Sequence, residues 1–320
     1  MSGLELARLN LLSPIALAFV LGAVATLVRS DLRIPDQLYT SLSIYLLLAI
    51  GLRGGAELSH TSLGAFWKPA LVTIFLGIGV PIWGYAILHY LGRFDVANAA
   101  ALAAHYGSVS AVTFSASLAF LDRVQVPYEG FMPTLVAFLE VPAIVVALLI
   151  ARTQMREGGS LGEAMRELVT GKSILLLVGG LVIGLLGGDA GLHKVAPLFV
   201  DLFNGALTIF LLEMGMVAAG RFRDLKTAGP FLLAFGIVMP ILHGALAIWL
   251  GTLVGLSLGG SFVLGVLAAS SSYIAAPAAV RIALPQANPG YYLTASLAIT
   301  FPFNLAVGLP IYYAIAQWLH

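Results

Sequence analysis

The chain has 320 residues, of which 60% are hydrophobic and 10% are charged, and its formal net charge is +1. A soluble domain carries roughly 25% charged residues, so this composition excludes an ordinary soluble protein and indicates a chain solvated mainly by lipid. The absence of cysteine excludes disulfides and thiolate metal sites. The small net charge provides no basic field that would attract nucleic acid.

Apolar stretches predict ten membrane-spanning segments, each roughly the 17 to 25 residues that a bilayer requires. In chain order they cover residues 11–28, 35–52, 67–90, 95–121, 130–151, 173–187, 195–219, 230–254, 259–283 and 289–319. We interpret the first as a span and not as a cleaved signal peptide, because no clear cleavage site follows it. The sequence therefore predicts an all-α polytopic membrane protein.

The one long polar stretch divides these spans five plus five. It gives a first repeat over 1–151, a linker over 152–172 and a second repeat over 173–320. Residues 161–169 of the linker fit a short amphipathic surface helix and a solvated connection about equally well.

Basic residues predict the orientation. Loops on one side of the predicted topology hold eleven lysines and arginines, and those on the other side hold five. By the positive-inside rule, both termini lie outside and the linker lies in the cytoplasm, as expected for a multi-pass protein of the inner (plasma) membrane. Five spans per half then give the two halves opposite orientations, as inverted repeats.

Two serine-bearing stretches, about half a chain length apart, interrupt the fourth and ninth spans and predict two discontinuous helices. Unpaired backbone groups cannot face hydrocarbon, so such breaks must line a cavity or be covered by protein. Interrupted segments at matching places in two halves point to the binding site of a secondary transporter. The candidate substrate-binding residues are Gly107, Ser108, Val109, Ser110, Thr113, Ser270, Ser271, Ser272 and Tyr273.

The chemistry expected at the breaks is anion binding. Half-helices beginning near Ala111 and Ala275 would present free N–H groups and positive dipole ends near the membrane midplane. Serine and threonine hydroxyls add donors, so the two breaks together would cradle a small oxyanion. The alternative is that these small residues only let helices pack closely, but two clusters at equivalent positions favour a site.

A coupling cation is expected beside the anion, because no lysine or arginine lies in the central part of any span. Sodium prefers hard oxygen ligands, and carboxylates inside a membrane usually have a function. The candidate ion-binding residues are Glu140, Thr300, Asn304 and Glu213. No spacing typical of a transition-metal site is present. Glu213 also fits a plain interhelical contact.

Four other functions are weighed against a sodium-coupled carrier. A channel would conduct at rates far above those of a carrier, and a structural or receptor membrane protein would bind ligand without flux. A cation/proton antiporter would use Glu140 and Glu213 as proton carriers. An enzyme is not expected: Ser108 has His105 nearby, but the span breaks there and no third group that would orient them is apparent. No phosphate-binding loop indicates ATP-driven transport, and no organic cofactor is expected.

Over nearly its full length the chain resembles the sodium-dependent bicarbonate transporter family, best known from cyanobacteria. The most specific matches are Tyr106-Gly107-Ser108-Val109-Ser110, Ala268-Ala269-Ser270-Ser271-Ser272 and Pro285-Gln286-Ala287-Asn288-Pro289. The resemblance implies bicarbonate and sodium binding at the two breaks. It also implies an elevator-type carrier, in which a mobile core holds the broken helices and a scaffold forms a homotrimer.

Two features depart from the family pattern. Tyr273 stands where cyanobacterial members have an aspartate, so ion coupling is expected to depend instead on Glu140, which matches an acidic position of the family. The linker over 152–172 is short, which argues against control by a PII-like regulator. We therefore expect sodium-coupled uptake of bicarbonate or a similar small anion.

Overall fold

The computed structural model describes residues 3–155 and 160–320, and every regular element within them is helical. Six helical segments are long and apolar enough to cross a membrane: Asp36–Leu58, Leu63–Leu91, Met132–Gln154, Lys172–Asp224, Ala228–Leu253 and Pro289–Leu319. Two shorter apolar helices are Pro14–Leu27 and Leu258–Ala269. This architecture agrees with the predicted all-α membrane protein.

The α-helices are α1 (Gly3–Leu11), α2 (Pro14–Leu27), α3 (Asp36–Leu58), α4 (Leu63–Ala86), α5 (Val96–Gly107), α6 (Ala111–Val124), α7 (Met132–Gln154), α8 (Leu161–Thr170), α9 (Lys172–Ala196), α10 (Phe203–Gly220), α11 (Leu225–Leu253), α12 (Leu258–Ala269), α13 (Ala275–Ala283), α14 (Pro289–Thr294), α15 (Phe301–Phe303) and α16 (Leu309–Leu319). Short π-helical stretches are Ile87–Leu91, Pro197–Asp201, Ala295–Thr300 and Asn304–Gly308, and Phe222–Asp224 is a 3₁₀ turn.

Interruptions within the predicted spans explain why fewer than ten long helices are found. The fourth span is the pair α5 and α6, and the ninth is the pair α12 and α13. The sixth and seventh spans lie in one helical segment, because a π-helical stretch joins α9 to α10. The tenth span alternates between α-helical and π-helical turns.

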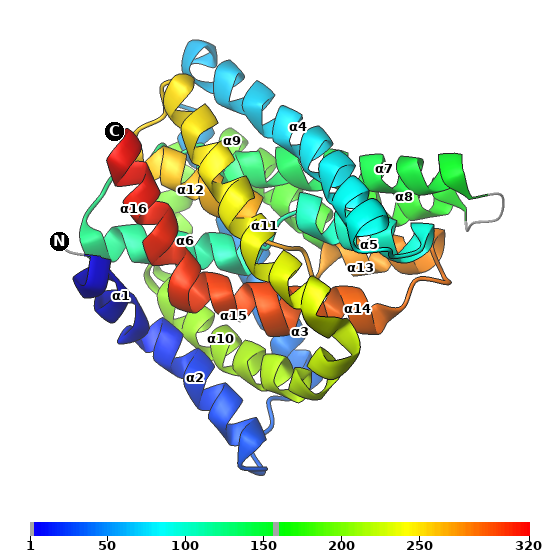
Figure 1. The fold of residues 1–320 in the computed structure, drawn as a ribbon. Coiled ribbons are helices and arrows are strands. Elements are labelled where there is room, and N and C mark those ends of the chain that lie inside the picture. The colour runs from blue at the N-terminus through cyan, green and yellow to red at the C-terminus, as the bar shows by residue number, and fades with distance from the viewer. Residues whose placement is uncertain (1–2, 156–159) are drawn as a thin grey trace.

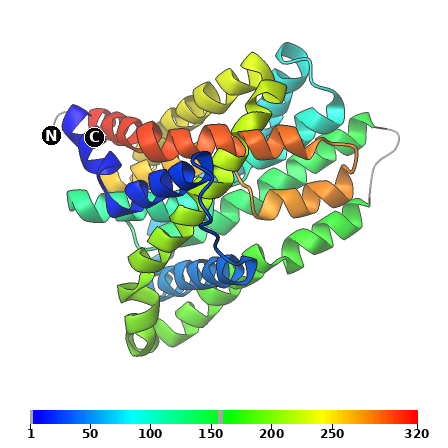
Figure 2. The same ribbon diagram turned by 90° about the horizontal axis from the view of Figure 1, so that it is seen from below.

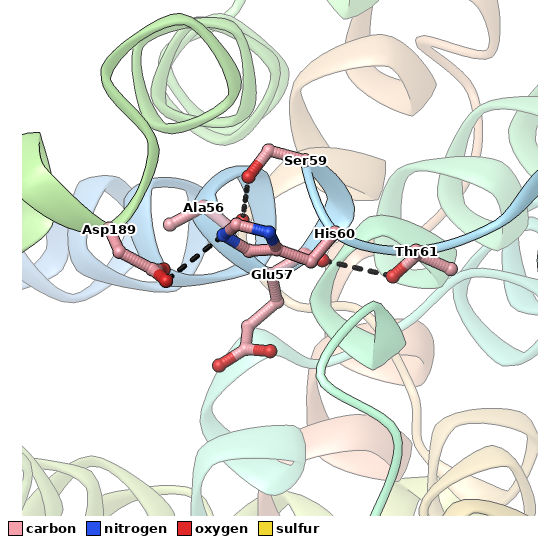
Figure 3. Close-up of polar contacts among 6 residues, drawn as sticks. All are labelled: Ala56, Glu57, Ser59, His60, Thr61 and Asp189. Atoms are coloured by element: carbon pink, nitrogen blue, oxygen red, sulfur yellow. Dashed lines mark hydrogen bonds and ion pairs between the residues drawn. The ribbon is translucent and has the colours of Figure 1, made fainter.

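The sixth span is predicted to end at residue 187, and the backbone leaves the helical conformation at Gly188, where two helical pieces within α9 (Lys172–Ala196) meet at a kink. Gly188 has φ +54° and ψ −162° and separates the two helical pieces, in a conformation that glycine adopts readily. Beyond the kink, Asp189 pairs with His60, which lies just past the end of α3, at an Nε2–Oδ2 distance of 3.0 Å (Figure 3). Both side chains are exposed, so the pair adds little stability. In this view Glu57 points away from the pair.

Glycines let two pairs of helices approach closely. A side chain at Gly55 of α3 would place its Cβ 2.1 Å from the carbonyl oxygen of Leu181 in α9. A side chain at Gly215 of α10 would place its Cβ 2.0 Å from the carbonyl oxygen of Phe19 in α2. Small residues allow such contacts in membranes, where close packing holds helices together because lipid removes the hydrophobic driving force.

Packing divides the helices into two sets. Helices α2, α3, α9 and α10 pack on one another, and we call them the four-helix set. Helices α4 to α7 and α11 to α16 pack mainly among themselves, and we call them the broken-helix set. The two sets meet where α3 and α9 contact α7, and where α10 contacts α6.

The two broken helices run through the middle of the molecule in opposite directions (Figure 1). Helices α5 and α13 lie side by side toward the end that holds α8, and α6 and α12 lie side by side toward the end that holds α1. Helices α6 and α13 therefore both begin near the middle of the molecule. A second view also places the C-terminus with α1 at one end and α8 at the other (Figure 2).

The linker contains a helix, which decides between its two interpretations. Ser160 caps α8 by accepting a hydrogen bond from the backbone N–H of Glu163 at 3.1 Å. Ala164 and Leu168 are buried, and α8 packs chiefly on α13. The amphipathic pattern therefore forms a short helix that covers the second half of a broken helix.

Candidate substrate and ion site

The first break spans the residues between α5 and α6. Ser108 is extended, with φ −87° and ψ 178°, and Ser110 caps α6 by accepting from the backbone N–H of Thr113 at 3.1 Å. Gly107 ends α5, and a Cβ there would lie 2.9 Å from Pro81 Cδ and 3.0 Å from Ala143 Cβ. The glycine is thus required for packing against α4 and α7.

The second break repeats this arrangement. Ser270 ends α12 in an extended conformation, and its hydroxyl donates to the carbonyl of Leu267 at 2.8 Å. The hydroxyl of Ser272 accepts from the backbone N–H of Ala276 at 3.2 Å, in the first turn of α13. Helices α6 and α13 therefore start at Ala111 and Ala275, where the sequence predicted them to start.

Hydrogen bonds join the two breaks directly. The backbone N–H of Ser110 donates to Ser270 Oγ at 2.9 Å, and Ser110 Oγ donates to the Tyr273 hydroxyl at 3.2 Å. The backbone N–H of Ser272 donates to the His105 carbonyl at 2.8 Å. The free backbone groups of each break are thus satisfied partly by the other break, as buried chain inside a membrane requires.

One predicted hydroxyl at the breaks has no partner. Ser108 Oγ is buried, with the residue 1% exposed, and it makes no hydrogen bond within the described part of the chain. The hydroxyl of Ser271, by contrast, lies 2.7 Å from that of Ser296 in the tenth span. A buried polar atom without a partner costs free energy in the folded state, so Ser108 Oγ is the hydroxyl most available to a ligand.

Two predicted ion ligands already have protein partners. Thr300 Oγ1 donates to the carbonyl of Gly236 at 2.7 Å and accepts from the Tyr106 hydroxyl at 2.7 Å. The Asn304 amide donates to the carbonyl of Ala269 at 2.8 Å. These bonds attach the tenth span to α11, α5 and the end of α12. That Thr300 and Asn304 bind an ion stays a prediction.

The oxygen of the Asn304 amide is also hydrogen-bonded. Asn304 Oδ1 accepts from the hydroxyl of Tyr312 at 2.7 Å. With both ends of its amide bonded, Asn304 holds the carbonyl that α12 presents at the second break. These bonds tie the end of α12 to the tenth span.

Glu140 lies beside the breaks in a small enclosed cavity. The cavity has a volume of about 10 Å³, and its polar lining includes Glu140, Ser110, Tyr273 and Ser173. Glu140 is 3% exposed, and its Oε1 accepts from Ser173 Oγ at 3.3 Å. A space of this size holds about one water molecule. The oxygen-rich lining fits a small cation, and the cavity is too small for an anion such as bicarbonate.

Glu213 lies elsewhere, on α10 in the four-helix set. Its carboxylate is close enough to Tyr39 and Asp36 of α3 to interact with them electrostatically. One carboxylate oxygen is buried without a hydrogen-bond partner among the described residues. The structure therefore does not bring Glu213 into the cavity that holds Glu140.

A larger cavity lies against α6, the half-helix that follows the first break. It has a volume of about 300 Å³ and lies between the two helix sets, with Arg53 and Glu57 of α3 facing Phe114 of α6. Phe114 lies one helical turn beyond Ser110 on α6, so one wall of this cavity is a turn away from the first break along the helix. Gly130 belongs to the same lining, and a Cβ there would lie 2.3 Å from a Glu57 carboxylate oxygen.

Sequence reasoning missed several residues of this region. Ser173 and Ser296 contribute hydroxyls to predicted site residues, and Tyr106 fixes Thr300. Ser296 and Tyr106 lie on predicted spans, where a single hydroxyl resembles an ordinary packing residue. Ser173 gave no signal, because its contact with Glu140 depends on how α7 and α9 cross.

The ligand chemistry of the region is that of hydroxyls, carbonyls and one carboxylate. Within residues 3–155 and 160–320, no group of three or more histidine, aspartate or glutamate side chains is placed to hold a metal ion. An ion site here would therefore depend on neutral oxygen ligands around Glu140, as in transporters that bind sodium at unwound helices.

Comparison with known proteins identifies the family of the chain. The curated proteins contain no matching relative. The profile of the Na+-dependent bicarbonate transporter superfamily matches residues 14–317, which is nearly the whole chain. Its members are transporters and not enzymes. The chain therefore belongs to the Na+-dependent bicarbonate transporter superfamily.

Proposed function

We propose that the protein is a secondary active transporter that couples uptake of bicarbonate, or a similar small anion, to sodium. The observation that carries the proposal is the meeting of the two breaks, where the Ser110 backbone N–H bonds Ser270 Oγ at 2.9 Å. Two half-helices, α6 and α13, begin at this point from opposite sides of the crossing. Family membership supplies the substrate class.

The anion would be held by dipoles and hydroxyls. The N-terminal ends of α6 and α13 carry partial positive charge, and Ser108 offers a buried hydroxyl that has no protein partner among the described residues. The remaining substrate-binding residues proposed at the breaks are Gly107, Val109, Thr113 and the run from Ser270 to Tyr273. Several of these shape the break through their backbone rather than through a side chain.

The cation would sit beside the anion and balance its charge. Glu140 is the one acidic side chain among the described residues that line the small cavity, and a bound cation would hold it ionised. Ser110 and Tyr273 line this cavity and also form a hydrogen bond between the breaks. A shared lining couples the two ligands, because each would lower the electrostatic cost of burying the other. This is the physical basis that we propose for symport.

Alternating access would come from movement of the broken-helix set against the four-helix set. An inverted repeat is supported by the helix pairs α3–α9 and α2–α10, because exchanging α2 with α9 and α3 with α10 maps each pair onto the other. The repeats would cover 1–151 and 173–320, joined by the linker. The broken-helix set would be the moving core of an elevator, and the four-helix set its scaffold.

The proposed assembly and placement follow from the same scheme. The scaffold would form a homotrimer in the plasma membrane, with both termini outside and the linker in the cytoplasm. The short linker offers little surface for a PII-like regulator. The large cavity beside Arg53 would then open to the outside, since it lies toward the end of the molecule opposite α8.

The test is uptake of radiolabelled bicarbonate into proteoliposomes. An inward sodium gradient should drive accumulation, and dissipating the gradient with an ionophore should abolish it. Competition by other small anions then defines the substrate range. A cation/proton antiporter would instead acidify or alkalinise the vesicles in response to sodium without bicarbonate. That result, without sodium-driven bicarbonate uptake, would reject the proposal.

A further inference from the structure

Two cavities near the linker share part of their walls. The small cavity beside Glu140 is lined by Ser173 and Ile274, and so is a second cavity of about 320 Å³ at the end of the molecule that holds α8. Ser173 and Ile274 are therefore the partition between the buried carboxylate and a space near the surface. Nothing in the proposed function assigns a role to either residue.

The contact between Ser173 and Glu140 is weak for a hydrogen bond between buried groups. Ser173 Oγ lies 3.3 Å from Glu140 Oε1, whereas a hydroxyl usually approaches an acceptor to about 2.7–2.8 Å. Ser173 is 8% exposed and Glu140 is 3% exposed. A long contact between buried oxygens that both face one cavity leaves space for a small cation to bind both.

The side chains that line the small cavity select the class of ligand. Its lining has one carboxylate, Glu140, together with the hydroxyls of Ser110, Ser173 and Tyr273, and none of the described residues that line it is a lysine or arginine. An anion inside this cavity would be repelled by the ionised form of the Glu140 carboxylate. A cation would gain from the carboxylate and from hydroxyl oxygens, which can accept or coordinate as well as donate.

Ser173 also comes from a different helix set than the other oxygens. Ser173 lies in the first turn of α9, in the four-helix set, whereas Glu140 lies on α7, and Ser110 and Tyr273 lie at the breaks. A cation among these groups would have ligands on both sets. Movement of one set against the other would remove a ligand and weaken binding.

We infer that Ser173 is a cation ligand that the four-helix set contributes to the Glu140 site, and that the ion leaves past Ser173 and Ile274 into the cavity beside α8. The inference rests on the proposed function and adds to it a residue, a route and a reason for ion release. Lys172 and Glu167 line the outer cavity, so this cavity, unlike the inner one, carries charges of both signs. A cation that reaches it is no longer held by an unbalanced carboxylate.

Site-specific thiol modification tests the inference, because the natural chain has no cysteine. A Ser173→Cys variant carries the only thiol and keeps nearly the size of the native side chain. A water-soluble methanethiosulfonate reagent is applied to the purified protein in nanodiscs, which leave both faces accessible. The reagent should modify the thiol in sodium-free buffer that contains choline. Sodium at ten times the dissociation constant of the Ser173→Cys variant for sodium should slow modification of the thiol about tenfold by mass action.

A matched control separates sodium binding at this site from a general effect. An Ala278→Cys variant places the thiol in the outer cavity, away from Glu140, and its modification rate should be the same with and without sodium. Adding Glu140→Gln to Ser173→Cys should abolish the protection. Equal rates for Ser173→Cys with and without sodium, or protection of both thiols alike, would overturn the inference. So would a Ser173→Cys thiol that never reacts.

Uptake kinetics give an independent readout. Ser173→Ala should raise the sodium concentration for half-maximal uptake by about tenfold, as expected for loss of one charge-assisted contact of about 1.5 kcal/mol. The half-saturating bicarbonate concentration at saturating sodium should stay unchanged, and Ser173→Thr should restore sodium affinity.

If wild-type vesicles show sodium-driven uptake but Ser173→Cys is unprotected, only this inference fails. If wild-type vesicles show no sodium-driven uptake, the proposed function itself fails.

Discussion

Replacing Ser108 by alanine separates a binding role from a structural role. Ser108 Oγ is buried and has no hydrogen-bond partner within the described chain. The substitution therefore breaks no protein hydrogen bond and removes a buried polar atom whose desolvation costs about 1–3 kcal/mol. Without ligand, we expect the Ser108→Ala protein to be as stable as the wild type or more stable.

The same substitution should weaken transport. A hydrogen bond from a hydroxyl to a charged group contributes about 1.5–3 kcal/mol, which corresponds to a loss of roughly tenfold to a hundredfold in affinity. We expect the half-saturating bicarbonate concentration to rise by that factor, measured as radiolabelled uptake at saturating sodium. Thermal unfolding in detergent, recorded for the same preparations, should show no decrease in Tm.

A buried serine on α6, the half-helix that follows this break, serves as the control. Ser115 donates to the carbonyl of Ala111 at 2.8 Å, one turn back along α6, and Ser115→Ala should leave the bicarbonate concentration dependence unchanged. Unchanged uptake by Ser108→Ala would refute the assignment of this hydroxyl to the substrate. A marked fall in Tm would also refute it, because it would show that the hydroxyl has a structural partner.

Three further predictions concern the ion, the tenth span and the packing of the four-helix set. Glu140→Gln should remove the sodium dependence of uptake, and persistence of that dependence in proteoliposomes would exclude Glu140 as the coupling residue. Asn304→Leu should destabilise the protein by about 1–3 kcal/mol for each buried group left unpaired, seen as a lower Tm, because both ends of this amide are bonded. Gly215→Ala should destabilise by about 1–3 kcal/mol through overpacking against α2, whereas Gly205→Ala in the same helix, where a Cβ meets nothing within 4 Å, should be neutral or stabilise by up to about 1 kcal/mol. Equal Tm values for the two glycine variants would contradict the packing account.

The broken helices could be predicted from the sequence because their signal is local. A run of serines and glycine inside an apolar span competes with helical hydrogen bonding, and lipid forbids free backbone groups. The predicted starts of the half-helices, Ala111 and Ala275, are confirmed. Local periodicity left residues 161–169 open between a short helix and a solvated connection, and neither α8 nor its contact with α13 was decided by the sequence.

Features that depend on contacts between distant residues were not predictable in the same way. The sequence shows that Thr300 and Asn304 are polar, but it does not show that their groups already have protein partners. Gly107 is the natural residue for a break, yet its neighbours Pro81 and Ala143 explain it through packing. The kink at Gly188 lies at the predicted end of the sixth span, but the sequence did not show that the chain resumes a helix directly beyond it.

Simultaneous measurement of sodium and bicarbonate entry tests the central claim most directly. Radioactive sodium and radiolabelled bicarbonate are followed in the same proteoliposomes, for the wild type and for a Ser108→Ala, Ser271→Ala double variant. If both ions bind where the helix breaks meet, sodium entry should require bicarbonate, and the double variant should lose both fluxes while still inserting into the membrane. Sodium entry that is equally fast without bicarbonate, or a double variant with undiminished fluxes, would contradict the account.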